Sequence, residues 1–399
     1  VDATNSLRIG PPSDPLTEVG PLIEPPQGKL AWALSTLEPG ERWLVQPRQL
    51  DETGRYWSPG IRTGVVEGSR FHREEFFGPV LGVMHARSLE HAIELQNGVD
   101  YGLTAGLYTQ NPHDLEHWLD EVEAGNLYVN RGITGAIVQR QPFGGWKRSS
   151  VGTGTKAGGP NYLVGLGSWR AVSGGAPSST LHLRGLDTRI TSVIEASQPS
   201  LEFAAFESLR RAALSDAVAW DREFGAVKDV SGLGVERNLF RYRPVPVAVR
   251  ATAGTPLQDV LRIALAGLRT MAPFTLSVAD GLPAAVRRAL VALDVPVFAG
   301  KDVEWVQRVR GPLDLVAALA DEDQVPRVPR VRIVGPSEAR AALAEVLAIA
   351  VDGDPDLAVY AGEATTAGRI ELLPFLHEQA ISITAHRFGA PDDWRSAVI

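Results

Sequence analysis

Alternation between strand-like and helix-like segments is the feature that most restricts the fold of this chain. Between residues 80 and 130, three apolar segments of strand length are separated by two segments with helical spacing. Ser88 is a favoured N-cap for the first helix, and Asn111 followed by Pro112 starts the second. The strand-length segments are residues 80–86, 103–109 and 127–130. This β-α-β-α-β order implies one parallel sheet with crossover helices, in which ligands bind at the carboxyl ends of the strands.

The same alternation returns after residue 244 and predicts a second α/β layer structure. Its strand candidates are residues 244–250, 274–278, 295–299, 331–335 and 357–361, and a helical region at 201–220 precedes them. The most linker-like decapeptide is AVSGGAPSST at 171–180. We therefore predict domains at 1–170 and 181–399 with a linker at 171–180. Residues 1–70 are rich in Pro and Gly and predict loops with one short helix near residues 29–37.

Composition excludes several classes of function. The 399 residues carry a net charge of −8, which gives no electrostatic footprint for nucleic acid. No apolar run approaches the roughly 20 residues that span a bilayer. The chain has no cysteine, so disulfides, thiolate metal sites and thiol catalysis by its own residues are excluded. The first residues carry neither an initiator Met nor a signal-peptide pattern, and we expect the chain to be cut from a longer protein.

A glycine-punctuated stretch at residues 126–163 begins at the third strand candidate. Its aromatic residues Phe143, Trp146 and Tyr162 argue against disorder, so a rigid binding loop is the working hypothesis. Main-chain N–H groups at 132–136 suit an anionic group such as a carboxylate, and Phe143 could supply an apolar wall. A purely structural turn explains the same glycines equally well.

Other motifs in the sequence also have simpler, structural interpretations. Residues 152–157 match G-x-G-x-x-A, but Gly158-Gly159-Pro160 forbids the helix that a dinucleotide fingerprint must open, so a loop is predicted. Glu74 and Glu75 precede a Gly-Pro turn. They are either a solvated carboxylate pair, or one of them accepts hydrogen bonds from a ribose diol while a neighbouring aromatic residue packs on a flat cofactor ring. The histidines show no metal-ligand spacing, and no G-x-S-x-G elbow is present.

Several of these segments resemble one family. EFFGPV at 75–80 looks like the E-x-F-G-P-V motif of aldehyde dehydrogenases, and PFGG at 142–145 resembles their P-F-G-G turn. The stretch at 132–163 is similar to L-glutamate γ-semialdehyde (Δ1-pyrroline-5-carboxylate) dehydrogenases, especially the dehydrogenase half of bifunctional proline utilization A. RYRPVPV at 241–247 and residues 372–388 resemble the C-terminal aldehyde-dehydrogenase-like domain of the longer proline utilization proteins.

The resemblance implies a fold, an activity and roles for single residues. The fold would be the remainder of an aldehyde dehydrogenase catalytic domain followed by a non-catalytic Rossmann-type α/β domain. Glu75 would hold the ribose hydroxyls of NAD and Phe77 would pack near its nicotinamide. Gly135 and Ala136 would bind the substrate α-carboxylate through main-chain N–H groups, and Phe143 would line the aldehyde pocket. In the family a cysteine thiolate attacks glutamate semialdehyde, hydride passes to NAD, and water releases glutamate.

The sequence departs from the family because it contains no nucleophilic cysteine. We expect the isolated chain to be inactive and to need an upstream part with the nucleophile, the general-base glutamate and the main dinucleotide domain. The family implies a homo-oligomer, an upstream proline dehydrogenase region, and a cytoplasmic location or peripheral membrane contact through that region. A non-catalytic scaffold built from degenerate aldehyde dehydrogenase modules is the alternative from another class, and a dehydrogenase of a different aldehyde is the third. NAD or NADP preference stays open.

Overall fold

The computed structural model describes residues 1–170, 185–309, 330–387 and 390–391. The contacts within the chain divide it into two compact units. The first unit is Val1–Asp100 with His117–Val122, and the second is Tyr101–Glu116 with Glu123–Ile399. The linker predicted at 171–180 lies outside the described residues, so the predicted domain boundary stays a prediction. No helix within the described ranges is both long enough and apolar enough to cross a bilayer.

The first unit is built on a three-stranded sheet in the order β1-β2-β3. β1 pairs antiparallel with β2, and β2 pairs parallel with β3. The short helix expected near residues 29–37 is present as α2, and Ser88 caps α4 by accepting a hydrogen bond from the His91 N–H. The elements are α1 (Asp2–Asn5), α2 (Gly28–Ser35), β1 (Arg42–Val45), β2 (Gly60–Thr63), α3 (Arg70–Arg73), β3 (Val80–Val83) and α4 (Leu89–Asn97), and helix α5 (Pro112–Glu121) is divided between the units.

One expectation about this region is wrong: the first three predicted strands do not share a sheet. β3 pairs with β2, whereas β5 (Thr104–Leu107) and β6 (Asn126–Val129) pair in parallel in another sheet. The partner strand β2 was not predicted, because it carries a charged residue, Arg62, in its middle. That side chain is fully buried, in an ion pair with Glu41 and 4.2 Å from the ring of Phe71.

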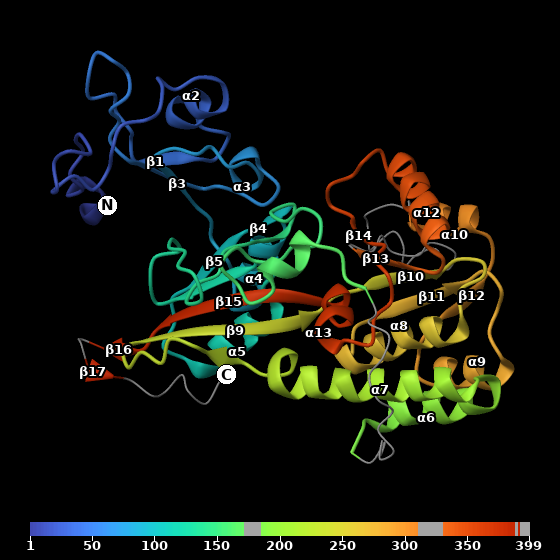
Figure 1. Cartoon of the computed structure of the whole chain (residues 1–399). Coiled ribbons are helices and arrows are strands. Elements are labelled where there is room, and N and C mark those ends of the chain that lie inside the picture. Colours follow the sequence, from blue (N-terminus) through green and yellow to red (C-terminus); the bar gives the residue numbers. More distant parts are fainter. Residues whose placement is uncertain (171–184, 310–329, 388–389, 392–399) are drawn as a thin grey trace. The chain divides into compact units, whose positions relative to one another are not determined.

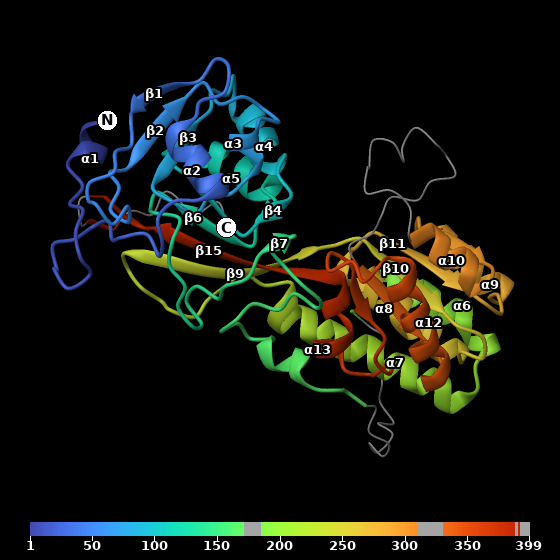
Figure 2. The same ribbon diagram turned by 90° about the horizontal axis from the view of Figure 1, so that it is seen from above.

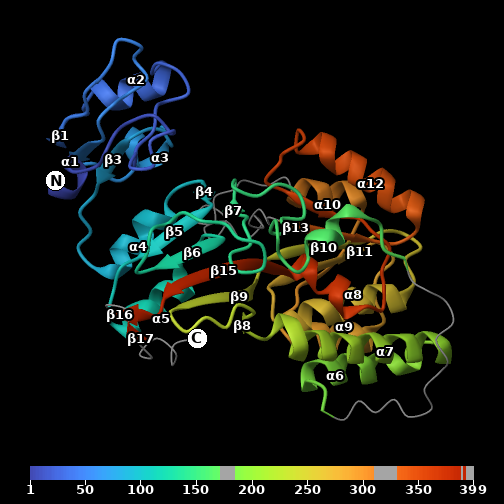
Figure 3. The ribbon, with the colours of Figure 1, turned by 60° about the vertical axis from the view of Figure 1, so that its left-hand side comes forward.

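In the second unit, a mixed sheet runs in the order β5-β6-β15-β9-β8. β15 (Leu376–Thr384) lies parallel to β6 and antiparallel to the long strand β9 (Glu236–Pro244), with β8 (Lys228–Asp229) at the edge. Figure 1 shows red β15 beside yellow β9, Figure 2 shows the two running side by side, and Figure 3 shows β15 between β6 and β9. Two short pairs complete the strands, β4 (Tyr101–Gly102) with β7 (Trp146–Lys147) and β16 (His386–Arg387) with β17 (Ala390–Pro391).

A second sheet of this unit is parallel throughout and has the order β12-β11-β10-β13-β14. Its strands are β10 (Val247–Ala251), β11 (Phe274–Val278), β12 (Val297–Ala299), β13 (Arg330–Val334) and β14 (Ala358–Tyr360), close to the predicted positions. Its helices and short turns are η1 (Tyr162–Leu166), α6 (Thr188–Ser197), η2 (Gln198–Ser200), α7 (Phe203–Ala219), η3 (Trp220–Phe224), α8 (Leu257–Thr270), α9 (Ala284–Val291), α10 (Asp302–Val309), α12 (Ser337–Ala350), α13 (Gly368–Glu371) and η4 (Leu373–Phe375). Parallel strands with crossover helices confirm the α/β class.

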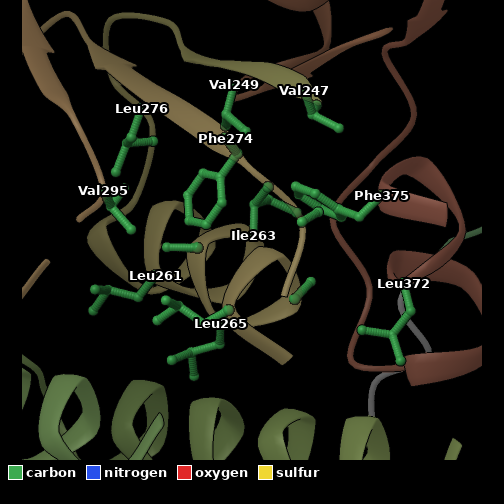
Figure 4. Packing of buried hydrophobic residues seen from close by; sticks show 14 of the residues in the cluster. Val247, Val249, Leu261, Ile263, Leu265, Phe274, Leu276, Val295, Leu372 and Phe375 are labelled. Carbon is green, nitrogen blue, oxygen red and sulfur yellow. The ribbon is translucent and has the colours of Figure 1, made fainter. Parts of the chain in front are cut away.

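Both faces of the parallel sheet are covered by helices, so its strand residues are mostly apolar, although β10 and β13 also carry buried arginines. Val247 and Val249 of β10 face the large cluster that includes Leu261 and Leu265 of α8. Figure 4 shows these side chains meeting Phe274 and Phe375, whose rings are 5.9 Å apart and nearly perpendicular. The residue between the two valines, Ala248, belongs instead to the cluster with α10 and α12. Figure 3 shows α6–α9 on one side of this sheet and α10 and α12 on the other.

A buried ion pair joins two helices of the large cluster. Asp216 of α7 accepts hydrogen bonds of 2.8 Å from both terminal nitrogens of Arg262 on α8, and Arg262 Nε donates to the Thr365 carbonyl. Both side chains are almost completely buried, and burial raises the pKa of Asp216 to about 6.

We predict that Asp216→Ala lowers the free energy of unfolding by about 3–5 kcal/mol, because it leaves a buried arginine without its anion. The matched control is Asp221→Ala, which removes the exposed partner that η3, directly after α7, gives to Arg269 of α8, and it should cost less than about 1 kcal/mol. Urea denaturation measures both. Equal losses for the two variants would contradict a structural role specific to the buried pair.

Candidate functional site

Glu75 and Phe77 lie on a turn that is fixed by the residue between them. Phe76 is buried and stacks on Phe71 at 4.8 Å and on Trp32 at 5.4 Å. Because alternate residues of the turn point away from Phe76, the side chains of Glu75 and Phe77 are both exposed. The turn is therefore anchored by one buried aromatic residue and presents one exposed carboxylate and one exposed aromatic ring.

The backbone of this turn is constrained. Phe77 has φ = 52°, in the left-handed region that bulky residues seldom adopt. A Cβ on Gly78 would lie 2.3 Å from Leu30 Cδ1, so any larger residue at this position would require the Leu30 side chain of α2 to move. Lys29 of α2 also donates a hydrogen bond from Nζ to the Glu75 carbonyl. Strain of this kind concentrates at sites where it sets the direction of a side chain, and here it turns the Phe77 ring to solvent, 78% exposed.

The predicted anchor residues Gly135 and Ala136 lie on an exposed loop that follows β6 in the second unit. Gly135 has φ = 119°, a conformation that L side chains rarely adopt, and its carbonyl accepts a 2.6 Å hydrogen bond from the Tyr128 hydroxyl. Burial raises the pKa of Tyr128, which keeps that hydroxyl protonated as a donor. Within the described ranges, the N–H groups of residues 132–136 make no hydrogen bond. They remain available to an anion.

The base of this loop is held by two strands that come much later in the chain. Arg131 forms an ion pair with Glu236 of β9 at 3.0 Å and donates a hydrogen bond to Ser382 Oγ of β15. Arg140, at the other end of the loop, contacts the same carboxylate at 3.1 Å. Gln141 is buried, and its amide lies 3.0 Å from Ser382 Oγ and 3.2 Å from the Gly135 carbonyl. One carboxylate thus closes the loop by pairing with an arginine at each end.

Phe143 lies beyond the loop on a turn that is fixed through its backbone. Its N–H and carbonyl both pair with Ala157, at 3.0 and 2.8 Å. Asn126 of β6 donates to the Pro142 carbonyl at 2.9 Å and accepts from the Gly144 N–H at 3.2 Å. The ring itself is 36% exposed, so it can still contact a ligand.

Lys156 is the buried centre of this turn. The side-chain Nζ of Lys156 donates to Asn126 Oδ1 at 2.9 Å and to the Gly144 carbonyl. Its main-chain N–H donates to the Glu378 carboxylate at 2.6 Å. Burial lowers the pKa of the Lys156 amine to about 7, and the charge of Glu378 opposes that shift. Burial also raises the pKa of Glu378, and Asn161 donates to its other oxygen at 2.6 Å. These polar groups join the turn to β6 and β15.

The segment at 152–157 is a loop, as the following Gly-Gly-Pro predicted. Gly152 and Gly154 have φ values of 65° and 64°, and no α-helix begins in the residues that directly follow them, up to η1 at Tyr162. A glycine fingerprint for dinucleotides requires that helix, so the segment does not have this geometry.

The predicted site residues therefore form two groups, each within its own unit. Glu75 and Phe77 share one turn of the first unit, and Gly135, Ala136 and Phe143 belong to the second unit. Sequence reasoning missed the residues that hold the second group in place, namely Arg131, Arg140, Lys156, Glu236, Ser382 and Glu378. No local pattern identifies them, because their partners lie up to 251 residues away.

Comparison with known proteins assigns the first part of the chain to a family. Residues 1–167 match the aldehyde dehydrogenase family, and they therefore carry an aldehyde dehydrogenase family domain. The curated relatives include a 1-pyrroline-5-carboxylate dehydrogenase of Bacillus subtilis, 41% identical over 165 residues, and the second such enzyme of Halalkalibacterium halodurans, 40% identical over 167 residues. Each alignment covers 41% of this chain and 32% of the relative, so the chain spans about a third of these relatives.

A solved structure extends the similarity to almost the whole chain. Proline utilization A from Corynebacterium freiburgense superposes with a TM-score of 0.72 at 39% identity, covering 98% of this chain and 34% of that one. The resemblance noted for the C-terminal residues thus has a counterpart in three dimensions.

We predict that Glu236→Gln speeds amide hydrogen exchange at Ile137, Gln139 and Gln141, the hydrogen-bonded amides of this segment, because the neutral amide weakens the ion pairs with Arg131 and Arg140. Hydrogen-exchange mass spectrometry measures the change. The control is Glu345→Gln on an exposed position of α12, which should leave these amides unchanged. Unchanged protection of the three amides in Glu236→Gln would show that the pairs do not hold the loop.

A second prediction concerns pH. The Lys156 amine loses its proton near pH 7 in the folded chain and near its ordinary value of 10.5 in the unfolded chain. The unfolded state therefore binds more protons between these values, and the Lys156 contribution to stability rises with pH over that window. Below pH 7 both states are protonated, and the cost of burying the charge is fully present.

Lys156→Met removes this titration. Relative to the parent chain, the variant should be less stable at pH 9.5 than at pH 6.5, measured by urea denaturation. Lys147→Met, at a less buried position of the same segment, controls for the loss of a positive charge. A parent-to-variant difference that stays constant or falls as pH rises would exclude the assigned pKa.

Proposed function

We propose that this chain is part of an NAD-dependent L-glutamate γ-semialdehyde dehydrogenase, which oxidises the semialdehyde to L-glutamate in proline catabolism. The observation that carries the proposal is the loop at 132–136, whose N–H groups have no partner among the described residues and are ready to bind a carboxylate. An aldehyde that carries an α-carboxylate suits this loop better than an uncharged aldehyde does. The names of the curated relatives support the same substrate.

Each predicted residue then receives a role. The N–H groups of Gly135 and Ala136 bind the α-carboxylate, which orients the other end of the substrate toward the reacting centre. Phe143 forms an apolar wall beside the aliphatic part of the substrate. The clamp from Glu236 to both ends of the loop keeps the N–H groups in place before substrate arrives, which reduces the entropic cost of binding.

Glu75 and Phe77 fit a nicotinamide dinucleotide. The Glu75 carboxylate is exposed, makes no ion pair within the described ranges, and can accept hydrogen bonds from two ribose hydroxyls. The exposed Phe77 ring can pack on the flat nicotinamide. When bound, NAD supplies the acceptor for the hydride that leaves the aldehyde carbon. The two side chains orient the cofactor and take no part in proton or hydride transfer.

The nucleophile is assigned to a segment outside these 399 residues, because the chain itself has no cysteine. We assign the general-base glutamate to the same outside segment, and a proline dehydrogenase region is proposed to accompany it. Residues 181–399 are proposed to be non-catalytic. Their contribution is structural, since β9 and β15 supply Glu236 and Ser382 to the loop and Glu378 to the turn of Phe143.

The test uses two proteins, the isolated chain and the product of the whole gene, assayed for NADH formation. The isolated chain should show no turnover. The whole protein should oxidise glutamate semialdehyde roughly 10- to 100-fold more efficiently than 4-aminobutanal, which lacks the α-carboxylate, because hydrogen bonds to a charged group are lost. Ala136→Pro removes one N–H and should reduce this preference, whereas the control Ala136→Gly keeps it.

The outcomes separate the alternatives. Turnover by the pure isolated chain would overturn the assignment of the nucleophile to another segment. Equal efficiency with both aldehydes in the whole protein would indicate a dehydrogenase of a different substrate. A whole protein that binds its partners but turns over no aldehyde would support the non-catalytic scaffold instead.

A further inference from the structure

The second unit contains a cavity of about 620 Å³ that the proposed dehydrogenase function does not use. It lies between the segment at 153–170, the strands β13 and β14, and residues 370–378. The two sides meet where the Tyr360 hydroxyl donates a 3.0 Å hydrogen bond to the Thr153 carbonyl. Its volume suits a small organic molecule.

A buried arginine lines this cavity without an anionic partner at ion-pair distance in the described part of the chain. Arg330, at the start of β13, is 4% exposed. Its Nη1 donates to the carbonyls of Leu373, Pro374 and Leu376, at 3.0, 3.1 and 2.7 Å. Its Nη2 makes no hydrogen bond with a described residue and lies 3.9 Å from the position of a Cβ on Gly154, which also lines the cavity. Three neutral carbonyls do not neutralise a guanidinium that is always charged.

A second arginine that lines the cavity is also bound through main-chain carbonyls. Arg340, on the first turn of α12, donates from Nε to the Gly335 carbonyl at 2.8 Å and from Nη1 to the Ala361 carbonyl at 2.5 Å. Its Nη2 has no hydrogen bond to a described residue. Ser337 also lines the cavity at the N-terminus of the same 14-residue helix, where the helix dipole adds positive potential.

The carboxylates of the cavity do not cancel this charge. Glu371 is held by Arg332, whose Nη2 lies 3.3 and 3.2 Å from the two carboxylate oxygens. Glu378 attracts Arg330 electrostatically, but its oxygens accept hydrogen bonds from the Lys156 N–H and from Asn161. Glu363 is exposed. None of these carboxylates lies within ion-pair distance of Arg330 or Arg340 in the described part of the chain, so both guanidinium groups can still attract an anion.

The rest of the lining is largely apolar. The Tyr360 ring lies 5.8 Å from the Arg330 guanidinium, and Trp169 is fixed on the opposite segment by a 2.9 Å hydrogen bond to the Val164 carbonyl. Leu373 and Val359 contribute further apolar surface. An aromatic or aliphatic body would therefore find contacts beside the two guanidinium groups.

We propose that this cavity binds a small organic anion, with a carboxylate or phosphate on Arg340 beside the N-terminus of α12, the charge of Arg330 adding to the attraction, and an apolar body against Tyr360 and Trp169. The guanidinium donors that have no acceptor among the described residues supply the hydrogen bonds, and their planar fork matches either anion. Gly154 lets the loop backbone pass close to Arg330 without filling the space. The site is separate from the proposed carboxylate anchor at 132–136, so either proposal can fail without the other.

The experiment measures binding to the 399-residue chain by isothermal titration calorimetry. Phenyl phosphate and benzoate test the two anions with an apolar body, and benzamide is the neutral analogue. At least one anion should bind about tenfold or more tightly than benzamide. Arg340→Gln should weaken that anion by about tenfold or more, and Arg288→Gln, on an exposed face of α9, should leave it unchanged.

Because calorimetry does not locate the ligand, Trp169→Phe provides a second measurement. The anion should change the tryptophan fluorescence of the parent chain, and that change should shrink in Trp169→Phe. Circular dichroism confirms that each variant is folded. Equal affinity for benzamide, no effect of Arg340→Gln, or no binding of any probe at millimolar concentration would overturn the proposal.

Discussion

The insertion of β15 between β6 and β9 is the constraint on which the rest of the second unit depends. β15 hydrogen-bonds to β6 in parallel and to β9 along nine residue pairs in antiparallel. Segments more than 200 residues apart in sequence thereby form one rigid sheet. The cost of closing so long a loop grows only slowly with its length, so the extended pairing can compensate for it.

The loop and the turn that carry the proposed substrate contacts are both attached to this sheet by charged or polar residues. Glu236 and Ser382 hold the loop at 132–140, and Glu378 holds the turn through Lys156. Irregular backbone makes few hydrogen bonds of its own, so the loop and the turn are attached to the sheet mainly through these side chains. A precise loop in the first 170 residues therefore requires strands from the last 170, which gives the C-terminal region a structural reason to accompany residues 1–170.

Much of the regular structure could be predicted from local signals. The capped helix after Ser88 and the apolar strands of the second sheet are close to their predicted positions, because periodicity and capping are local. The pairing of strands could not be predicted, because two of the strands do not have an apolar pattern. β2 contains a buried arginine at residue 62, and β9 contains several charged residues among its apolar ones. The exposed loop at 132–136 was identified from its glycines, whereas the clamp on Glu236 depends on tertiary contacts that no single sequence pattern contains.

The central claim is that the free N–H groups at 132–136 bind a carboxylate. Titration of ¹⁵N-labelled chain with L-glutamate, followed by amide chemical shifts, tests it directly. The account predicts saturable downfield shifts of the Gly135 and Ala136 amides, and much smaller shifts with the dimethyl ester of glutamate, which lacks the anionic oxygens. Shifts that are absent at these two residues, or equal for glutamate and its diester, would contradict the claim.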